Sequence, residues 1–246
     1  VQRRHFSSKA AQTARLVATS KAVALAFGET GGKTEQLLRV LLADCLPSQL
    51  YARCGLRLAT AYLPMQTQET QDVELVLSEL TGSSLLVEQM YAGEWVQAHK
   101  TEDGQVFLFG QSGEELSRGI GQALASELAA GLVARECIVE GVLQRDVSSI
   151  QIIDCLWLDG RPLVRHSLRE RRSALESAVR SGNLVQLPPS EMFTLDEPPT
   201  AEVLSGFLQE AESCGCRGVT LKRLEREYEA GAVGSDACIS LLLPSA

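Results

Sequence analysis

The chain has 246 residues, 45% of them apolar, and a formal net charge of −8. This size allows one or two domains with a sizeable core, and no apolar run reaches the roughly 18–20 residues that cross a bilayer, so we expect no transmembrane segment. The acidic balance argues against a general affinity for DNA or RNA, because such proteins need a basic surface to replace phosphate counterions.

The first segment, residues 1–28, differs in charge from the rest of the chain. It holds five Lys or Arg and no Asp or Glu, so the total of −8 leaves −13 for residues 29–246. A basic, acid-free leader with many Ser, Thr and Ala is typical of an organellar transit peptide, and "RRHFSS" resembles a mitochondrial processing site. We therefore predict a transit-peptide-like leader and a mitochondrial location on the matrix side. An ordinary basic first helix is the alternative interpretation.

Residues 29–63 have a helical pattern. Apolar residues recur on a helical period in residues 33–46 and again in residues 48–63, which predicts two helices. Gly31-Gly32 separates them from the leader, and the second is expected to stop before Pro64, since the residue before a proline disfavours helix.

After Pro64 the pattern becomes mixed. In chain order we predict a helix at 72–80, strands at 84–91, 94–100 and 105–110, and a helix at 114–133 with a potential break near Gly119–Gly121. Strands at 137–144 and 150–158 follow, then a helix at 167–180, a loop or edge strand around 191–195, a helix at 200–215, and strands at 217–224 and 238–244. Strands and helices without strict alternation predict the α+β class, built on antiparallel sheets.

Several local signals sharpen these boundaries. Asp159-Gly160 predicts a tight turn between strands, and Thr200 a helix cap. In the helix at 167–180, Leu168, Leu175 and Val179 mark the buried face, whereas Arg171 and Arg172 are expected on a solvated or partner-facing surface.

The seven cysteines are odd in number and scattered along the chain. This pattern is typical of reduced, mostly buried thiols. Cys214-Gly-Cys216 is the only close pair, and without a second pair or a His cluster it is a poor zinc site. We predict no metal and no cofactor.

Five segments, taken in order, resemble the ATP-dependent DNA ligases of the covalent nucleotidyltransferase superfamily. They are "ETGGKTEQLLRVLLADCLPSQLYARCGLRLATAY", "PMQTQ", "QMYAGEWVQAHKTEDGQVFLFGQSG", "IIDCLWLDGRPLVRHSLRERRSAL" and "CGCRGVTLKRLEREYEAG". The resemblance implies an adenylation-domain fold of two antiparallel sheets flanked by helices over residues 64–246. It also implies that residues 29–63 are a helical remnant of the ligase DNA-binding domain, and that no C-terminal OB-fold follows.

The resemblance also identifies positions that carry chemistry in that family. A lysine there attacks the α-phosphate of ATP, and Met90 takes its place in this sequence. Other family motif residues are also replaced: the aspartate by Ala92, two arginines by Trp95 and Gln111, two glutamates that support a metal by Val142 and Arg217, and two lysines by Ser240 and Leu242. Lys222 matches a supporting cation of the family.

These substitutions lead to the expectation that the chain is not an enzyme and has no catalytic residue. We expect it to be a non-catalytic pseudo-ligase that serves as a structural or assembly subunit of a mitochondrial complex, of respiratory-chain or ATP-synthase type. Its partners would be protein subunits rather than nucleic acid. The alternative is a nucleotide- or nucleic-acid-binding protein without turnover, in which Tyr91 and Trp95 stack on a base. Asp154 is expected to cap a turn or pair with an arginine, and His99 to be structural.

Overall fold

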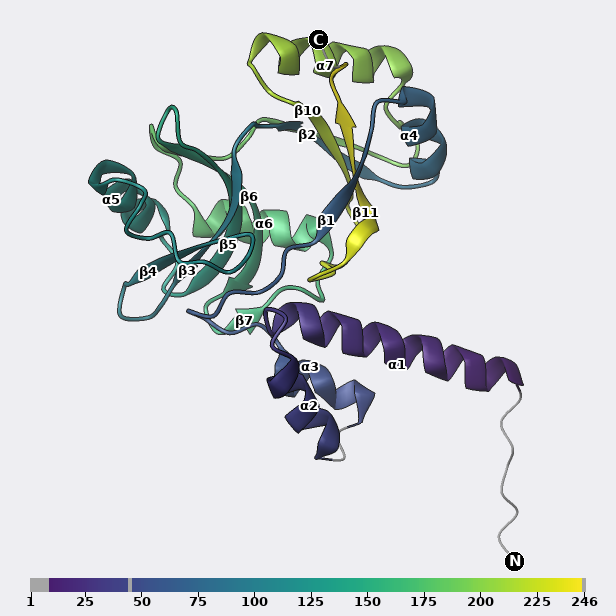
Figure 1. The fold of residues 1–246 in the computed structure, drawn as a ribbon. Helices are drawn as coiled ribbons and strands as arrows, with labels where there is room; N and C mark the ends of the chain where they lie inside the picture. Colours follow the sequence, from purple (N-terminus) through teal and green to yellow (C-terminus); the bar gives the residue numbers. More distant parts are fainter. Residues whose placement is uncertain (1–8, 44–45, 245–246) are drawn as a thin grey trace, which may run out of the picture.

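Two β-sheets organise the chain (Figure 1). The computed structural model describes residues 9–43 and 46–244. The helices are α1 (Lys9–Glu29), α2 (Thr34–Leu42), the 3-10 turn η1 (Pro47–Gln49), α3 (Leu50–Cys54), α4 (Val73–Leu80), α5 (Gln122–Gly131), α6 (Leu168–Ala178) and α7 (Ala201–Ser213). The strands are β1 (Gln66–Thr70), β2 (Leu85–Met90), β3 (Glu94–Lys100), β4 (Val106–Gly110), β5 (Cys137–Gln144), β6 (Ser149–Leu158), β7 (Arg161–Pro162), β8 (Val185–Gln186), β9 (Ser190–Phe193), β10 (Gly218–Arg223) and β11 (Val233–Leu242).

The two sheets are mainly antiparallel. The first, sheet A, has the strand order β1-β11-β10-β2-β9, and the second, sheet B, has the order β4-β3-β5-β6-β7 with β8 added beside β6. Only the pairs β1–β11 and β6–β8 are parallel among the described strands. The predicted α+β class with two sheets and flanking helices is confirmed.

Each sheet buries its own apolar core. Helices α4 and α7 cover sheet A, where Val87, Leu204 and Leu221 are fully buried (Figure 1). Helices α5 and α6 pack against sheet B around Leu128 and Leu175. Since side chains alternate between the faces of a strand, one face of each sheet is filled with apolar residues while the other remains available for polar ones.

The junction between the sheets is built from a short connection. Strands β2 and β3 are neighbours in the chain but belong to different sheets, so residues 91–93 cross from sheet A to sheet B. A Cβ atom on Gly93 would lie 2.5 Å from the carbonyl oxygen of Leu143 on β5. Only glycine fits at this crossing, because no real Cβ approaches a backbone oxygen so closely.

The second predicted helix of the 29–63 region is shorter than expected. It ends at Cys54, and residues 56–65 form a turn at 58–60 and then an irregular segment that leads into the body of the molecule. Tyr62 is fully buried there; its backbone N–H donates to Gln97 Oε1 at 3.1 Å and its carbonyl accepts from Gln97 Nε2 at 3.0 Å. These tertiary bonds replace the helical bonds that the apolar pattern predicts.

Two further segments differ from the sequence-based expectation. The helix predicted at 114–133 begins at Gln122, because residues before it lie along β4, where Leu116 N–H donates to the Leu108 carbonyl at 2.7 Å.

Arg171 and Arg172 are 2% and 4% exposed, so their expected place on a solvated surface is wrong. Both reach buried carboxylates of the sheets, as described below.

Helix α1 occupies the leader region, and α1, α2 and α3 lie together at one end of the molecule (Figure 1). Its last turn is held by close backbone contact, since a Cβ on Gly28 would lie 2.0 Å from the Ala230 carbonyl oxygen. The predicted processing site "RRHFSS" lies outside the described residues. Among the described helices, none is both long and apolar enough to cross a membrane.

Candidate functional site

A cleft of about 540 Å³ lies between the two sheets. Strands β1, β2, β10 and β11 supply one wall from sheet A, and β3, β5 and β6 supply the other from sheet B. Its polar and apolar linings are mixed, and its volume falls in the range of about 300–1,000 Å³ that is typical of small-molecule sites.

Most of the positions that the sequence singled out meet in this cleft. Six of the eight line it, namely Met90, Trp95, Gln111, Val142, Arg217 and Ser240. Ala92 and Leu242 do not line it. Residues far apart in the sequence therefore converge on one site, as expected if they belong to a single set of motifs.

Met90 lies at the end of β2 on the cleft wall. Its carbonyl oxygen accepts a 2.7 Å hydrogen bond from the backbone N–H of Arg217, which joins the ends of β2 and β10. Trp95 packs with its ring edge-on to Tyr62, with centroids 5.9 Å apart. These aromatic and thioether groups give the cleft an apolar side on which a planar ring can pack.

A buried ion cluster supplies the polar groups of the cleft. Glu88, two residues before Met90 on β2, contacts two cations: its Oε2 lies 3.2 Å from Arg172 Nη1, and its Oε1 contacts the amine of Lys222. Burial by itself lowers the pKa of Lys222, but the neighbouring acidic groups, Glu88 foremost and Asp154 with it, together raise that pKa above its usual value. Lys222 is therefore a protonated amine at neutral pH.

Asp154 of β6 and Arg171 of α6 form a second buried pair. Arg171 Nε and Nη2 donate to the two carboxylate oxygens at 2.9 and 3.0 Å, and Arg171 Nη1 also donates to the carbonyls of His166 and Arg226. The expected pairing of Asp154 with an arginine is confirmed. The capping box of Ser167 and Glu170 begins α6 and sets the helix phase that turns both arginines inward.

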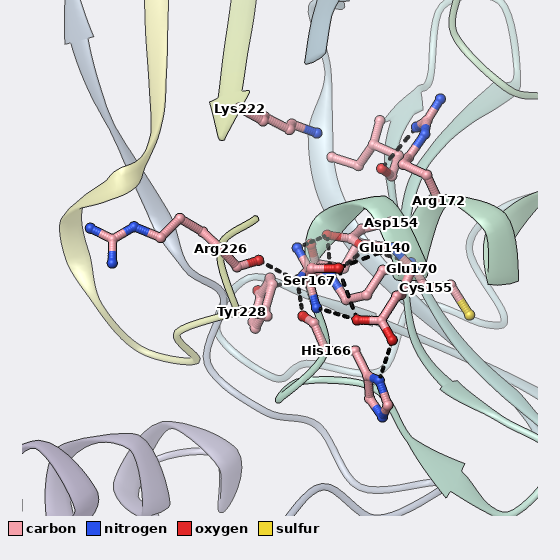
Figure 2. A network of polar contacts seen from close by, with 12 residues as sticks. Glu140, Asp154, Cys155, His166, Ser167, Glu170, Arg172, Lys222, Arg226 and Tyr228 are labelled. Atoms are coloured by element: carbon pink, nitrogen blue, oxygen red, sulfur yellow. Dashed lines mark hydrogen bonds and ion pairs between the residues drawn. The ribbon is translucent and has the colours of Figure 1, made fainter. Parts of the chain in front are cut away.

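Glu140 of β5 lies beside Asp154 (Figure 2). Its Oε1 accepts from the hydroxyl of Tyr62 at 2.8 Å and from the hydroxyl of Tyr228. Burial, reinforced by the charge of Asp154, raises the pKa of Glu140 to about 7. This carboxyl group is thus close to half protonated at neutral pH, and its two tyrosine donors hold it in place.

His99 does not take part in the cleft. It is fully buried in sheet B, its Nε2 lies 3.0 Å from Gln97 Oε1, and its ring meets Phe109 edge-on. Burial lowers the pKa of His99 to about 3, so the ring is neutral. The prediction of a structural histidine is consistent with this environment.

The carboxylates that line the cleft are not arranged as a site for a divalent cation. The two positions where the resembled family carries metal-supporting glutamates hold an apolar Val142 and a cationic Arg217, and Arg217 is paired with Glu69 at 3.5 Å. Across residues 9–43 and 46–244, no three His, Cys, Asp or Glu side chains gather in a metal-binding arrangement. The donor set present here does not fit a hard cation such as Mg²⁺.

Sequence reasoning missed several residues of the site. Glu88, Arg172, Tyr62 and Tyr228 were not selected, although Glu88 shares a strand face with Met90 because alternate residues point the same way. That alternation was the available signal. No such signal existed for Tyr62, whose burial depends on a segment that the apolar pattern predicts as helix.

Comparison with known proteins agrees with this arrangement. The family model described as "ATP dependent DNA ligase domain" matches residues 142–237. A DNA ligase of Pyrobaculum arsenaticum is 27% identical over 201 residues, covering 70% of this chain and 33% of that protein. DNA ligase 2 of Thermofilum pendens is 29% identical over 203 residues, covering 70% and 32%. The chain spans about a third of the length of these curated relatives.

The ligase domain of M. tuberculosis LigD is similar in fold, with a TM-score of 0.51 and 20% identity over 72% of this chain and 60% of that one.

The names of the relatives contradict the prediction that this chain is not an enzyme, because a DNA ligase is named for its enzymatic activity. The replaced motif residue Met90 does not by itself show a loss of activity, and that prediction is withdrawn.

Proposed function

We propose that the cleft between the two sheets binds an adenine nucleotide, because the chain is similar to ATP-dependent DNA ligases in sequence and in fold. The observation that carries this proposal is the convergence of six motif positions, together with Lys222, on one cleft of about 540 Å³. A nucleotide needs a flat apolar wall for its base and cations for its phosphates. Both kinds of group line the cleft.

The apolar wall comes from Met65, Trp95 and Ile153. Trp95 is fixed by its edge-on contact with buried Tyr62, so its ring is held in place before a ligand arrives. A pre-positioned aromatic ring lowers the entropy cost of binding a base. On the polar side, the protonated amine of Lys222 offers a positive charge to a phosphate group.

Titration of the protein with ATP, AMP and adenosine by calorimetry tests the proposal. We expect saturable binding of ATP, weakened at least tenfold by Lys222→Gln. The matched control is Lys100→Gln on β3, whose amine donates to the Leu132 carbonyl and does not line the cleft. It should change ATP affinity less than twofold. Absence of saturable binding for all three ligands at millimolar concentration would overturn the proposal.

We also propose a second role, as a protein subunit of a larger mitochondrial assembly. Its support is the exposed first half of α1, where Leu16 is 69% and Val17 is 64% exposed. An apolar groove of about 430 Å³ continues this surface over residues including Val23, Phe27 and Leu37. An exposed apolar helix surface of this kind is typical of a packing site for another protein, and the basic residues of α1 suit an acidic partner. The basic leader supports the mitochondrial location.

The native size of the protein after gentle solubilisation of mitochondria tests this second role. We expect migration far above the 26.6 kDa of the chain. A Leu16→Glu, Val17→Glu double variant should shift the protein toward monomer, whereas Glu176→Gln on the exposed side of α6 should not, because it leaves α1 unchanged. A wild-type protein found only as a monomer, or outside mitochondria, would contradict the proposal.

A further inference from the structure

The cleft carries a charge arrangement that differs from that of a metal-assisted nucleotide site. Five carboxylates line it, from Glu69, Glu88, Glu140, Asp154 and Glu227. A divalent cation between protein and phosphate would need at least one of these as a free ligand. If none of these carboxylates is free to bind a divalent cation, the negative charge of a nucleotide's phosphates must be neutralised by cationic side chains of the protein.

The deeply buried carboxylates are already committed to protein cations. Both oxygens of Glu88 contact Arg172 and Lys222, and both oxygens of Asp154 accept from Arg171. These side chains are between 2% and 12% exposed. Breaking such a buried pair to release a carboxylate is strongly unfavourable, because it leaves a guanidinium uncompensated.

Glu140 is no better as a metal ligand. The hydroxyls of Tyr62 and Tyr228 both donate to its Oε1, and its raised pKa of about 7 keeps much of it neutral at physiological pH. A hard cation requires a charged carboxylate. Two carboxylates remain, Glu227 at 3.9 Å from Arg165 and Glu69 at 3.5 Å from Arg217. Each is about half exposed and already faces an arginine, so neither is a free ligand held inside the cleft.

Arg217 lies in the cleft and replaces one of the glutamates that support a metal ion in the resembled family, so it brings a positive charge to that position. Its backbone is fixed on both sides, since its N–H donates to the Met90 carbonyl at 2.7 Å and its carbonyl accepts from Leu243 N–H at 2.9 Å. Its side chain lines the cleft and is half exposed, and its ion pair with Glu69 is long, at 3.5 Å. An exposed pair of this kind contributes little and is easily exchanged for a better anion.

The other arginines at the mouth are more closely held. Arg223 donates to the Asp236 and Glu79 carbonyls and to the Ser83 hydroxyl. Arg226 is about as exposed as Arg217, but it is in closer contact with its partner, the carboxylate of Asp236, than Arg217 is with Glu69. Arg217 is thus the guanidinium best able to turn toward a phosphate, and the planar guanidinium matches two phosphate oxygens at once.

Building on the proposed nucleotide site, we propose that the cleft binds nucleotide phosphates without a divalent cation and that Arg217, released from Glu69, neutralises them. Arg217 then determines the preference for a phosphorylated ligand over the bare nucleoside. The cation of the protein takes the place of the metal ion, and the buried carboxylates remain in their ion pairs.

Calorimetry at constant ionic strength tests this inference with ATP and adenosine, each in EDTA and in Mg²⁺. Wild-type protein should bind ATP in EDTA within twofold of its affinity in Mg²⁺. Arg217→Gln should weaken ATP binding in EDTA at least tenfold and leave adenosine binding within twofold, and Arg217→Glu should weaken ATP binding further. Glu69→Gln should strengthen ATP binding, because Arg217 loses its competing partner.

The matched control is Arg145→Gln, which removes a similarly exposed arginine from an ion pair with Glu94, away from the cleft. Thermal unfolding of each variant confirms that the fold is intact. If wild-type protein binds adenosine but requires Mg²⁺ for ATP, or if Arg217→Gln leaves ATP affinity unchanged, this inference is overturned while the nucleotide site stands. If neither ATP nor adenosine binds, the nucleotide site itself is refuted.

Discussion

Replacing Glu140 with glutamine should remove a pH dependence from the stability of this protein. Burial raises the pKa of Glu140 from 4.5 to about 7 in the folded state. A raised carboxyl pKa means that the folded state holds the proton more tightly than the unfolded state does. Its contribution to stability is therefore full below pH 4.5 and is lost as the pH rises toward about 7.

The magnitude follows from the size of this shift. One pKa unit corresponds to about 1.4 kcal/mol, so the rise from 4.5 to about 7 corresponds to a loss of about 3 kcal/mol between pH 4.5 and pH 8. Glutamine has nearly the same shape and keeps an oxygen that accepts from the hydroxyls of Tyr62 and Tyr228, but it does not titrate.

Urea unfolding at several pH values between 5 and 8.5 measures the effect. The free energy of unfolding of Glu140→Gln should exceed that of the wild type by about 3 kcal/mol at pH 8, and the difference should shrink as the pH falls toward 5. Any titration of Glu29, whose pKa burial also raises to about 7, cancels in this comparison. Glu176→Gln, on the exposed side of α6, is the control. A difference between variant and wild type that does not change with pH would refute this reasoning.

Three further changes test the network and the fold around the cleft. Tyr228→Phe should cost about 1–3 kcal/mol in urea unfolding, because the Met65 N–H that donates to its hydroxyl at 2.8 Å loses its partner; an unchanged midpoint would contradict this. Arg171→Met should cost about 3–5 kcal/mol by leaving Asp154 buried and unpaired, and adding Asp154→Asn should recover part of that loss; strictly additive costs would argue against the pair. Gly93→Ala should destabilise by about 1–3 kcal/mol, since its Cβ meets a β5 carbonyl oxygen at 2.5 Å, and a neutral thermal shift would show that the crossing between sheets can move.

Much of the secondary structure follows from local pattern alone. The alternation of apolar residues predicts β2, β3 and β5 within a residue or two, and the Ser167 and Glu170 pair begins α6 where the helical period predicts it. Thr200 accepts from Val203 N–H at the start of α7, as the cap signal predicts. These features depend on residues only a few positions apart, so neighbouring sequence suffices to define them.

The failures share one physical origin. The helix predicted over residues 48–63 ends at Cys54 because Tyr62 reaches Gln97 and Glu140, which lie 35 and 78 residues away. Arg171 and Arg172 were placed in solvent because charge favours water when no partner is known. Their partners, Asp154 and Glu88, come from two different sheets and become neighbours only after folding.

The sequence by itself determined the resemblance to the ATP-dependent DNA ligases, the α+β class and the positions where motif residues change, because these depend on which residues occur and in what order. Only the tertiary structure decided that β2 and β3 belong to opposite sheets, and therefore that Met90, Val142 and Arg217 line one cleft. The tertiary structure also decided which charged side chains of the cleft are held in buried ion pairs and which can bind a ligand. Whether a carboxylate can take a metal, or an arginine a phosphate, depends on the partner that folding brings within hydrogen-bonding distance, and that partner has no local signature in the sequence.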